Sequence, residues 1–150
     1  MALAAVMALA DGAGASVCLR PGEEAALNSK ALQSDLMVSA LACSETVRDN
    51  AWARKFESEL VANGAMLKGI FRQAYGTAGD TRLGQFVTAL ANDAAGRSAV
   101  EKAAFCAVTA RVFDRVLPMN GPEFLAFVAG PDFAGRHNFA ACGTRDSAAR

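Results

Sequence analysis

The sequence predicts an all-α protein, with a core of four helices, a short fifth helix and two disulfides that brace them. Four stretches place apolar residues at helical spacing. Alanine dominates the apolar fraction and only 7% of the residues are aromatic, which favours closely packed helices over strands. The cysteine count is four, an even number. A length of 150 residues suits one domain, which we expect over 16–150.

The first helix is expected over about 22–45. Pro21 and Gly22 precede Glu23 and Glu24, so proline stands at the helix start and acids lie at the positive end of its dipole. One face then carries Leu32, Leu36, Ala40 and Cys43. This position of Cys43 favours a buried disulfide over a reactive thiol.

The second helix is the clearest amphipathic stretch. Asp49 and Asn50 are suitable N-caps, and Gly76 is a suitable residue to end the helix. Large apolar residues line one face of this stretch: Trp52, Phe56, Leu60, Leu67, Ile70 and Phe71. The sequence therefore predicts a long helix from about residue 50 to Gly76.

A third helix is expected over about 81–95, with Gly96 at its end. Its apolar side consists of Leu83, Phe86, Val87, Leu90, Ala91 and Ala94. Ser98 and Glu101 have the spacing of a capping box, which would start the fourth helix. That helix carries Phe105, Val108, Val112 and Val116 on one face and stops near Pro118.

The C-terminal part is predicted to be less regular. Asn120, Gly121, Pro122 and Glu123 are expected to start the short fifth helix, which runs to about Val128. Residues 131–150 show no sustained period, so we expect an irregular tail there. Cys142 in this tail suggests that part of it is tied to the domain.

Residues 1–15 have the features of a signal peptide. An apolar run from Ala2 to Ala10 leads to Ala13-Gly14-Ala15, a small-residue pattern typical of a signal peptidase site. No Lys or Arg precedes the run, so a buried N-terminal helix is the alternative. The run is too short to span a bilayer, and we predict no transmembrane segment.

The four cysteines predict two disulfides and an oxidising compartment, periplasmic or extracellular. No CxxC pair or Cys/His cluster is present, so no metal site, haem attachment or redox motif is predicted. Three pairings are open. The helix faces favour Cys43 with Cys106, which leaves Cys18 with Cys142. Val17 before Cys18 argues against a lipoprotein cysteine, which needs a small residue there.

The charged residues do not predict a catalytic site or a bound cofactor. Basic and acidic residues balance at 15 each, which gives no electrostatic case for nucleic acid binding. His137 is the single histidine and lies in the irregular tail, where we expect it to pack or face solvent. The glutamates have ordinary structural roles as first-turn or capping acids. The loop Gly76–Asp80 lacks the lysine of a nucleotide-binding loop.

Two segments of the chain are similar to segments of a known class of proteins. They are Ala31-Leu32-Gln33-Ser34-Asp35-Leu36-Met37, with Cys43 after it, and Phe86-Val87-Thr88-Ala89-Leu90-Ala91-Asn92-Asp93. The region from Cys18 to Cys106 resembles small exported helical proteins of alphaproteobacteria. The resemblance implies a periplasmic address and supplies no activity or site residues.

Three functions remain in order of expectation. The first is an exported interaction or accessory protein that acts through a protein partner. The second is a carrier that holds an apolar small molecule in the bundle core. A hydrolase that recruits two carboxylates across the fold is the third.

Overall fold

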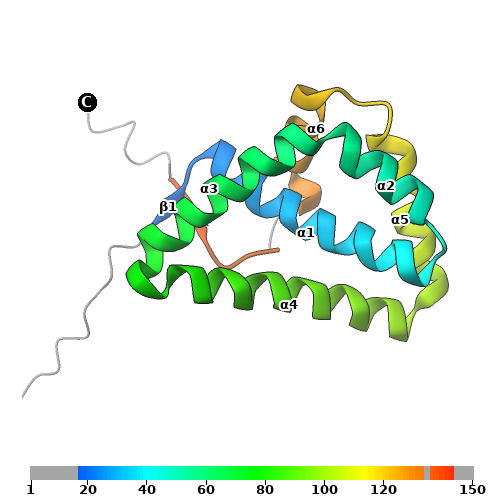
Figure 1. The fold of residues 1–150 in the computed structure, drawn as a ribbon, viewed down its shortest axis with the longest axis horizontal. Coiled ribbons are helices and arrows are strands. Elements are labelled where there is room, and N and C mark those ends of the chain that lie inside the picture. Colours follow the sequence, from blue (N-terminus) through cyan, green and yellow to red (C-terminus); the bar gives the residue numbers. More distant parts are fainter. Residues whose placement is uncertain (1–16, 134–135, 144–150) are drawn as a thin grey trace, which may run out of the picture.

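The computed structural model describes residues 17–133 and 136–143, and it confirms an all-α fold braced by two disulfides (Figure 1). The described residues form six α-helices: α1 (Pro21–Ala42), α2 (Thr46–Lys55), α3 (Glu57–Tyr75), α4 (Gly79–Val100), α5 (Lys102–Val116) and α6 (Gly121–Val128). Two 3₁₀ turns, Gly76–Ala78 and Pro131–Phe133, and two short strands complete them. The predicted signal peptide over 1–15 lies outside the described residues, as does the alternative of an N-terminal helix there.

Helix α1 is the central element of the fold. It contacts all five other helices and packs against both α3 and α4 (Figure 1). Small side chains make this possible because they let neighbouring backbones approach closely from several sides. The buried small residues of α1 are Ala25, Ala26, Ser29, Ala31, Ser34, Ser39 and Ala40. The predicted apolar face of this helix is confirmed at Leu32, Leu36 and Ala40, which are all buried.

The predicted long second helix is in fact two helices, α2 and α3, which meet at Phe56. The backbone of Phe56 departs from helical geometry, with φ −106° and ψ 21°. No proline or glycine stands at this bend, so the helical spacing of apolar residues continues across it. The sequence therefore predicted one helix. The bend lets α2 contact α5 while α3 contacts α4. Trp52, Phe56, Leu67, Ile70 and Phe71 are buried as expected.

Two glycines shape the turn between α3 and α4. Gly76 ends α3 with φ +58°, a left-handed conformation that favours glycine. A Cβ on Gly79 would lie 2.8 Å from the Cα of Arg72, so the start of α4 packs directly on the end of α3. The N-cap residue of α4 is Ala78, and Asp80 lies in the first turn, where its carboxylate pairs with Arg72 at 3.1 Å.

The predicted boundary between the third and fourth helices is wrong by about one turn. Helix α4 continues through Gly96 to Val100, and Ser98 is buried inside it instead of capping the next helix. Glu101 is the N-cap residue of α5, and no side chain there makes a capping hydrogen bond. A glycine inside a helix costs only about 1 kcal/mol, which the packing of Ala94 and Ser98 against the core offsets.

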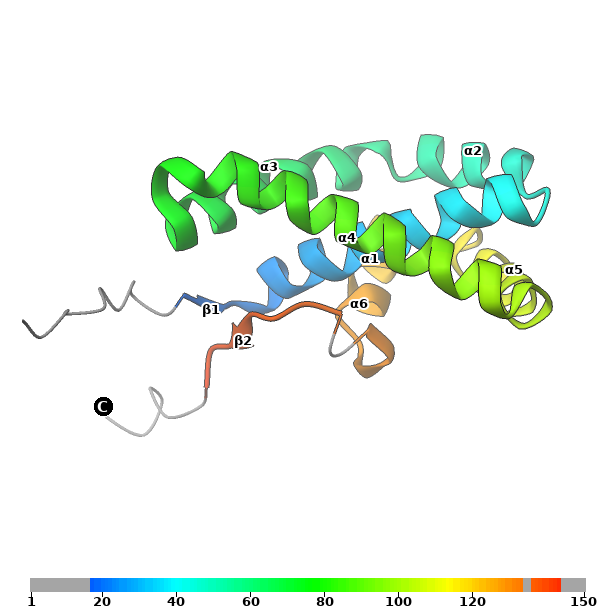
Figure 2. The same cartoon turned by 90° about the horizontal axis from the view of Figure 1, so that it is seen from below.

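Helix α6 begins with the predicted cap. The Asn120 side chain accepts a hydrogen bond from the Glu123 N–H at 2.9 Å, and the Glu123 carboxylate accepts from the Asn120 N–H at 2.8 Å. The tail then returns to the start of the domain. Strand β2 (Ala140–Ala141) pairs in parallel with β1 (Cys18–Leu19), and the two strands lie close together in Figure 2.

The core consists of two clusters on either side of α1. One is rich in aromatic residues from α2, α5 and α6, and it contains Trp52, Phe56, Phe113, Phe124 and Phe133. The other joins the start of α1 to α3 and contains Leu19, Leu27, Leu67, Ile70 and Phe71. Apolar side chains of the described helices therefore pack on both sides of α1.

The start of α1 gives a prediction about acid stability. Hydrogen bonds from the Arg20 guanidinium, at 2.9 Å, and from the Arg20 backbone N–H, at 2.8 Å, hold the pKa of Glu23 below its usual range. Because the pKa is lower in the folded chain, the carboxylate stabilises the fold at neutral pH. This stabilisation is lost as the pH falls through and below the range of an ordinary glutamate, about 4.3.

We therefore expect Glu23→Gln to lower the free energy of unfolding near neutral pH and to reduce its fall on acidification. Urea unfolding of the wild type and the variant at several pH values between about 7 and 3 measures both effects. Glu57→Gln, at an exposed position, is the matched control. Equal acid sensitivity in the wild type and Glu23→Gln would contradict this role of Glu23.

Candidate binding groove

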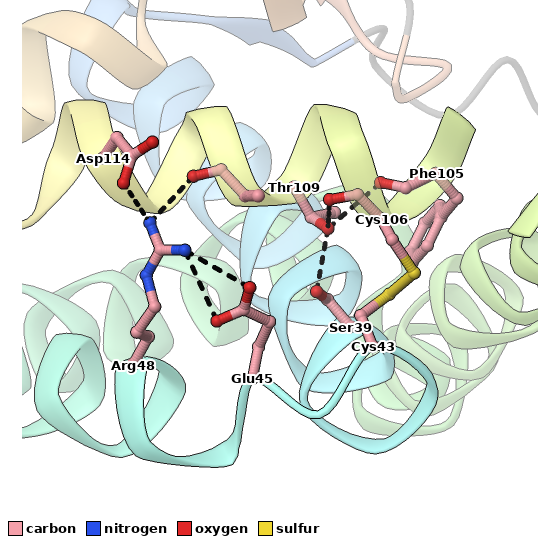
Figure 3. Close-up of polar contacts among 9 residues, drawn as sticks. Ser39, Cys43, Glu45, Arg48, Phe105, Cys106, Thr109 and Asp114 are labelled. Carbon is pink, nitrogen blue, oxygen red and sulfur yellow. Dashed lines mark hydrogen bonds and ion pairs between the residues drawn. A yellow bond between two sulfur atoms is a disulfide. The ribbon is translucent and has the colours of Figure 1, made fainter. Parts of the chain in front are cut away.

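The first predicted disulfide joins the end of α1 to α5. Cys43 follows directly after α1, and its sulfur bonds to that of Cys106 with the two Cα atoms 5.6 Å apart (Figure 3). Close to this bond, the Ser39 hydroxyl donates to the Thr109 hydroxyl at 2.8 Å, and Thr109 donates to the carbonyl of Phe105 at 3.0 Å. This corner is covalently fixed, and its buried hydroxyls are hydrogen-bonded.

Arg48 of α2 connects the same corner to α5 through an ion pair and a hydrogen bond. Its guanidinium contacts the Glu45 carboxylate at 3.2 Å, the Ala110 carbonyl at 2.9 Å and the Asp114 carboxylate (Figure 3). It also lies 5.1 Å from the centre of the Phe113 ring. These contacts engage the Arg48 guanidinium fully, so its role here is to hold α5 against α2.

The second predicted disulfide closes the ends of the domain. Cys18 bonds to Cys142, with a sequence separation of 124 residues and a Cα–Cα distance of 4.6 Å. The Cys142 N–H also donates to the Leu19 carbonyl at 2.9 Å. Both expected pairings are confirmed, and two disulfides fit a protein of an oxidising compartment.

A groove of about 1020 Å³ lies on the other side of α5. Cys106 and Val108 are two positions apart, so they point about 200° apart around the helix axis. The groove is bounded by α1, the end of α4, α5, α6 and the 3₁₀ turn after α6. Its apolar lining consists of Leu32, Leu36, Val100, Ala104, Phe105, Val108, Val112, Phe127 and Phe133.

An exposed apolar stripe runs along this groove. Ala104, Val108 and Val112 follow one another at intervals of four residues, so they form one row along α5, and Val100 lies at the end of α4, just before this helix begins. Val100 is 83% exposed and Val108 is 50% exposed. The predicted fourth-helix face is therefore split, because Phe105 and Val116 are buried in the core while Val108 faces solvent.

One end of the groove is built around Asp35. Its carboxylate accepts hydrogen bonds from Arg97 at 2.5 Å and from both terminal nitrogens of Arg136 at 3.0 and 3.1 Å. Arg97 also donates to Asp93 at 2.9 Å. Burial alone would lower the pKa of Arg97, but its contacts with Asp35 and Asp93 outweigh burial and raise that pKa. This end is a fixed ion-pair network.

The charges elsewhere on the rim are more exposed. The Arg115 guanidinium lies 3.8 Å from the Asp132 carboxylate and 4.8 Å from the centre of the Phe127 ring. Arg111 and Glu101 make no ion pair within the described part of the chain. The rim thus carries four arginines and four acids around an apolar floor.

The other sequence candidates do not converge on a catalytic site. The His137 side chain is buried in the tail, with its ring centre 6.4 Å from that of Phe139 and its Nε2 atom 3.5 Å from Glu24. Glu23 and Glu123 are engaged at helix starts. Among residues 17–133 and 136–143, no three His, Cys, Asp or Glu side chains are placed to hold a metal ion.

Sequence reasoning missed the groove because it assigned the valines of α5 to the core. A signal was present, because α5 carries apolar residues at more positions than a single buried face needs: Phe105, Val108, Val112, Phe113 and Val116.

None of the described helices is long and apolar enough to cross a membrane. Comparisons of the chain with protein-family models, curated proteins and solved structures find no match.

Proposed function

We propose that this chain is an exported helical binding protein, periplasmic or secreted, that acts as an accessory or interaction partner of another protein. Residues 1–15 direct its export and are removed in this proposal. The two disulfides support an oxidising destination. The resemblance of the Cys18–Cys106 region to exported helical proteins supports the same address.

The exposed valine row in the groove carries the proposal. A row of side chains four residues apart is the kind of ridge that fits the grooves of a second helix. From Ala104 to Val112 the row is about 12 Å long, which matches a partner helix of two to three turns. We therefore propose that the groove receives the apolar face of an amphipathic helix from the partner protein.

The charges around the groove favour a protein helix over an anionic lipid. Four arginines and four acids line the groove, so no single sign dominates its rim. Arg111 and Glu101 are available for opposite charges on a partner, while Asp35 is already held by Arg97 and Arg136. A partner helix with both acidic and basic flanks satisfies this rim.

The carrier function ranks second, because the buried apolar side chains of the described helices pack into two clusters in the centre of the bundle. A carrier would have to hold its ligand in a groove or pocket at the surface instead. The hydrolase function ranks third because its carboxylates are dispersed over the fold.

Site-specific photocrosslinking in the exporting cell tests the proposal. A photoreactive amino acid at Val108 should give one dominant adduct that contains a protein of defined mass. The same amino acid at Val47, which is exposed on α2 away from the groove, is the matched control. The Val108 adduct should disappear when Ala104→Lys, at an exposed position of the same row, is added to the same chain.

Two outcomes would contradict a protein partner in the groove. Equal adducts at Val108 and Val47 would show that the valine row has no selective contact. An adduct at Val108 with the mass of a small molecule would favour the carrier function.

A further inference from the structure

A second pocket lies on the opposite side of α1, away from the valine row. It has a volume of about 490 Å³ and is bounded by α1, α3 and α4. Its walls are mostly apolar and include Leu60, Val61, Leu67, Leu83 and Val87. Neither the bundle core nor the proposed partner helix uses this space.

Two buried polar side chains line this pocket without a hydrogen-bond partner. Ser29 of α1 is 1% exposed and Asn63 of α3 is 8% exposed. The Ser29 hydroxyl oxygen and the Asn63 side-chain nitrogen form no hydrogen bond within the described residues. Leaving such groups unpaired costs about 1–3 kcal/mol each, so they are expected to be matched by something that enters the pocket.

The charges of the pocket have a single sign. Lys30 and Lys68 line it, and no Asp or Glu does. Lys30 is half-buried and donates to the Gln33 side-chain oxygen at 2.9 Å, an uncharged partner. Burial lowers the pKa of Lys30, because it makes the charged ammonium group less stable. No acid in the pocket offsets this loss of stability. Lys68 is more exposed and also lies near Asp80, outside the pocket.

We propose that this pocket binds a small molecule with a carboxylate head and an apolar chain. The Lys30 ammonium group and the Asn63 amide donate to the carboxylate, and the Ser29 hydroxyl donates to its second oxygen. The leucine and valine side chains of α3 and α4 cover the apolar chain. This site is independent of the valine row, so either proposal can fail without the other.

Octanoate is the probe that we would use, with octanol as its uncharged counterpart of the same chain length. Titration of the oxidised protein is followed by calorimetry and by the NMR signals of the Asn63 side-chain amide. We expect octanoate to bind at least about tenfold more tightly than octanol, and to shift the Asn63 amide signals. Equal affinities, or no binding of octanoate, would overturn the proposal.

Variants separate binding from folding. Lys30→Met should keep or raise the melting temperature, because it removes a buried charge, and should weaken octanoate binding by about tenfold or more. Lys102→Met, at an exposed position outside the pocket, is the matched control and should bind as the wild type does. Val108→Lys should also bind octanoate normally. Loss of octanoate binding in Val108→Lys would place the ligand in the other groove and overturn this site.

Discussion

Phe124→Ala is expected to lower the free energy of unfolding by about 3–5 kcal/mol. Phe124 of α6 is fully buried, and its ring centre lies 4.5 Å from that of Phe56 and 5.9 Å from that of Trp52. Removing it leaves a cavity between α2 and α6 that the fixed backbone cannot close. Because Trp52 is the single tryptophan, its fluorescence reports unfolding in urea at this very cluster.

The exposed Val47 provides the control for this experiment. Val47→Ala removes apolar atoms from α2 at a position that is almost fully exposed, so a change within about 0.5 kcal/mol is expected. A loss below about 1 kcal/mol for Phe124→Ala would show that α6 is not part of the cooperative core.

Loss of the Cys43–Cys106 disulfide is the second large effect. The bond closes a loop with a sequence separation of 63 residues, for which restriction of the unfolded chain gives about 4 kcal/mol. The double variant Cys43→Ala with Cys106→Ala avoids an unpaired thiol and keeps Cys18–Cys142 intact. Urea unfolding under non-reducing conditions measures the loss.

Hydrogen bonds near this disulfide should keep the double variant folded, so that its unfolding can be measured. Arg48 and the Ser39–Thr109 pair still connect α1 and α2 to α5, so the native arrangement of α5 should survive at low urea. Circular dichroism should therefore remain helical. A change in unfolding free energy below about 1 kcal/mol would contradict the stabilising role of this bond.

Local sequence rules predicted most of the helices because their signals are short-ranged. Pro21, Asn120 and Glu123 act at the helix ends where they stand, and Gly76 ends α3 with the left-handed backbone expected of it. The helix faces favoured Cys43 with Cys106 but left three pairings open, and the structure shows the favoured one.

Features set by tertiary packing were not predictable in the same way. The bend at Phe56 carries no breaking residue and arises where the ring enters the aromatic cluster. Gly96 predicted the end of one helix and Ser98 the cap of the next. Contacts with the core instead extend α4 past both residues. Whether Val108 faces the core or solvent depends on where α6 and the tail lie, which periodicity along α5 does not encode.

The most direct test is a native, non-reducing mass spectrum of the protein purified from the exported fraction, wild type beside Val108→Lys. The expected wild-type result is a chain that lacks residues 1–15, has both disulfides and is held in a defined complex with a second protein. Val108→Lys should give the same oxidised chain alone. A reduced, uncleaved chain, or a complex that survives Val108→Lys unchanged, would contradict an exported protein that binds its partner through the valine row.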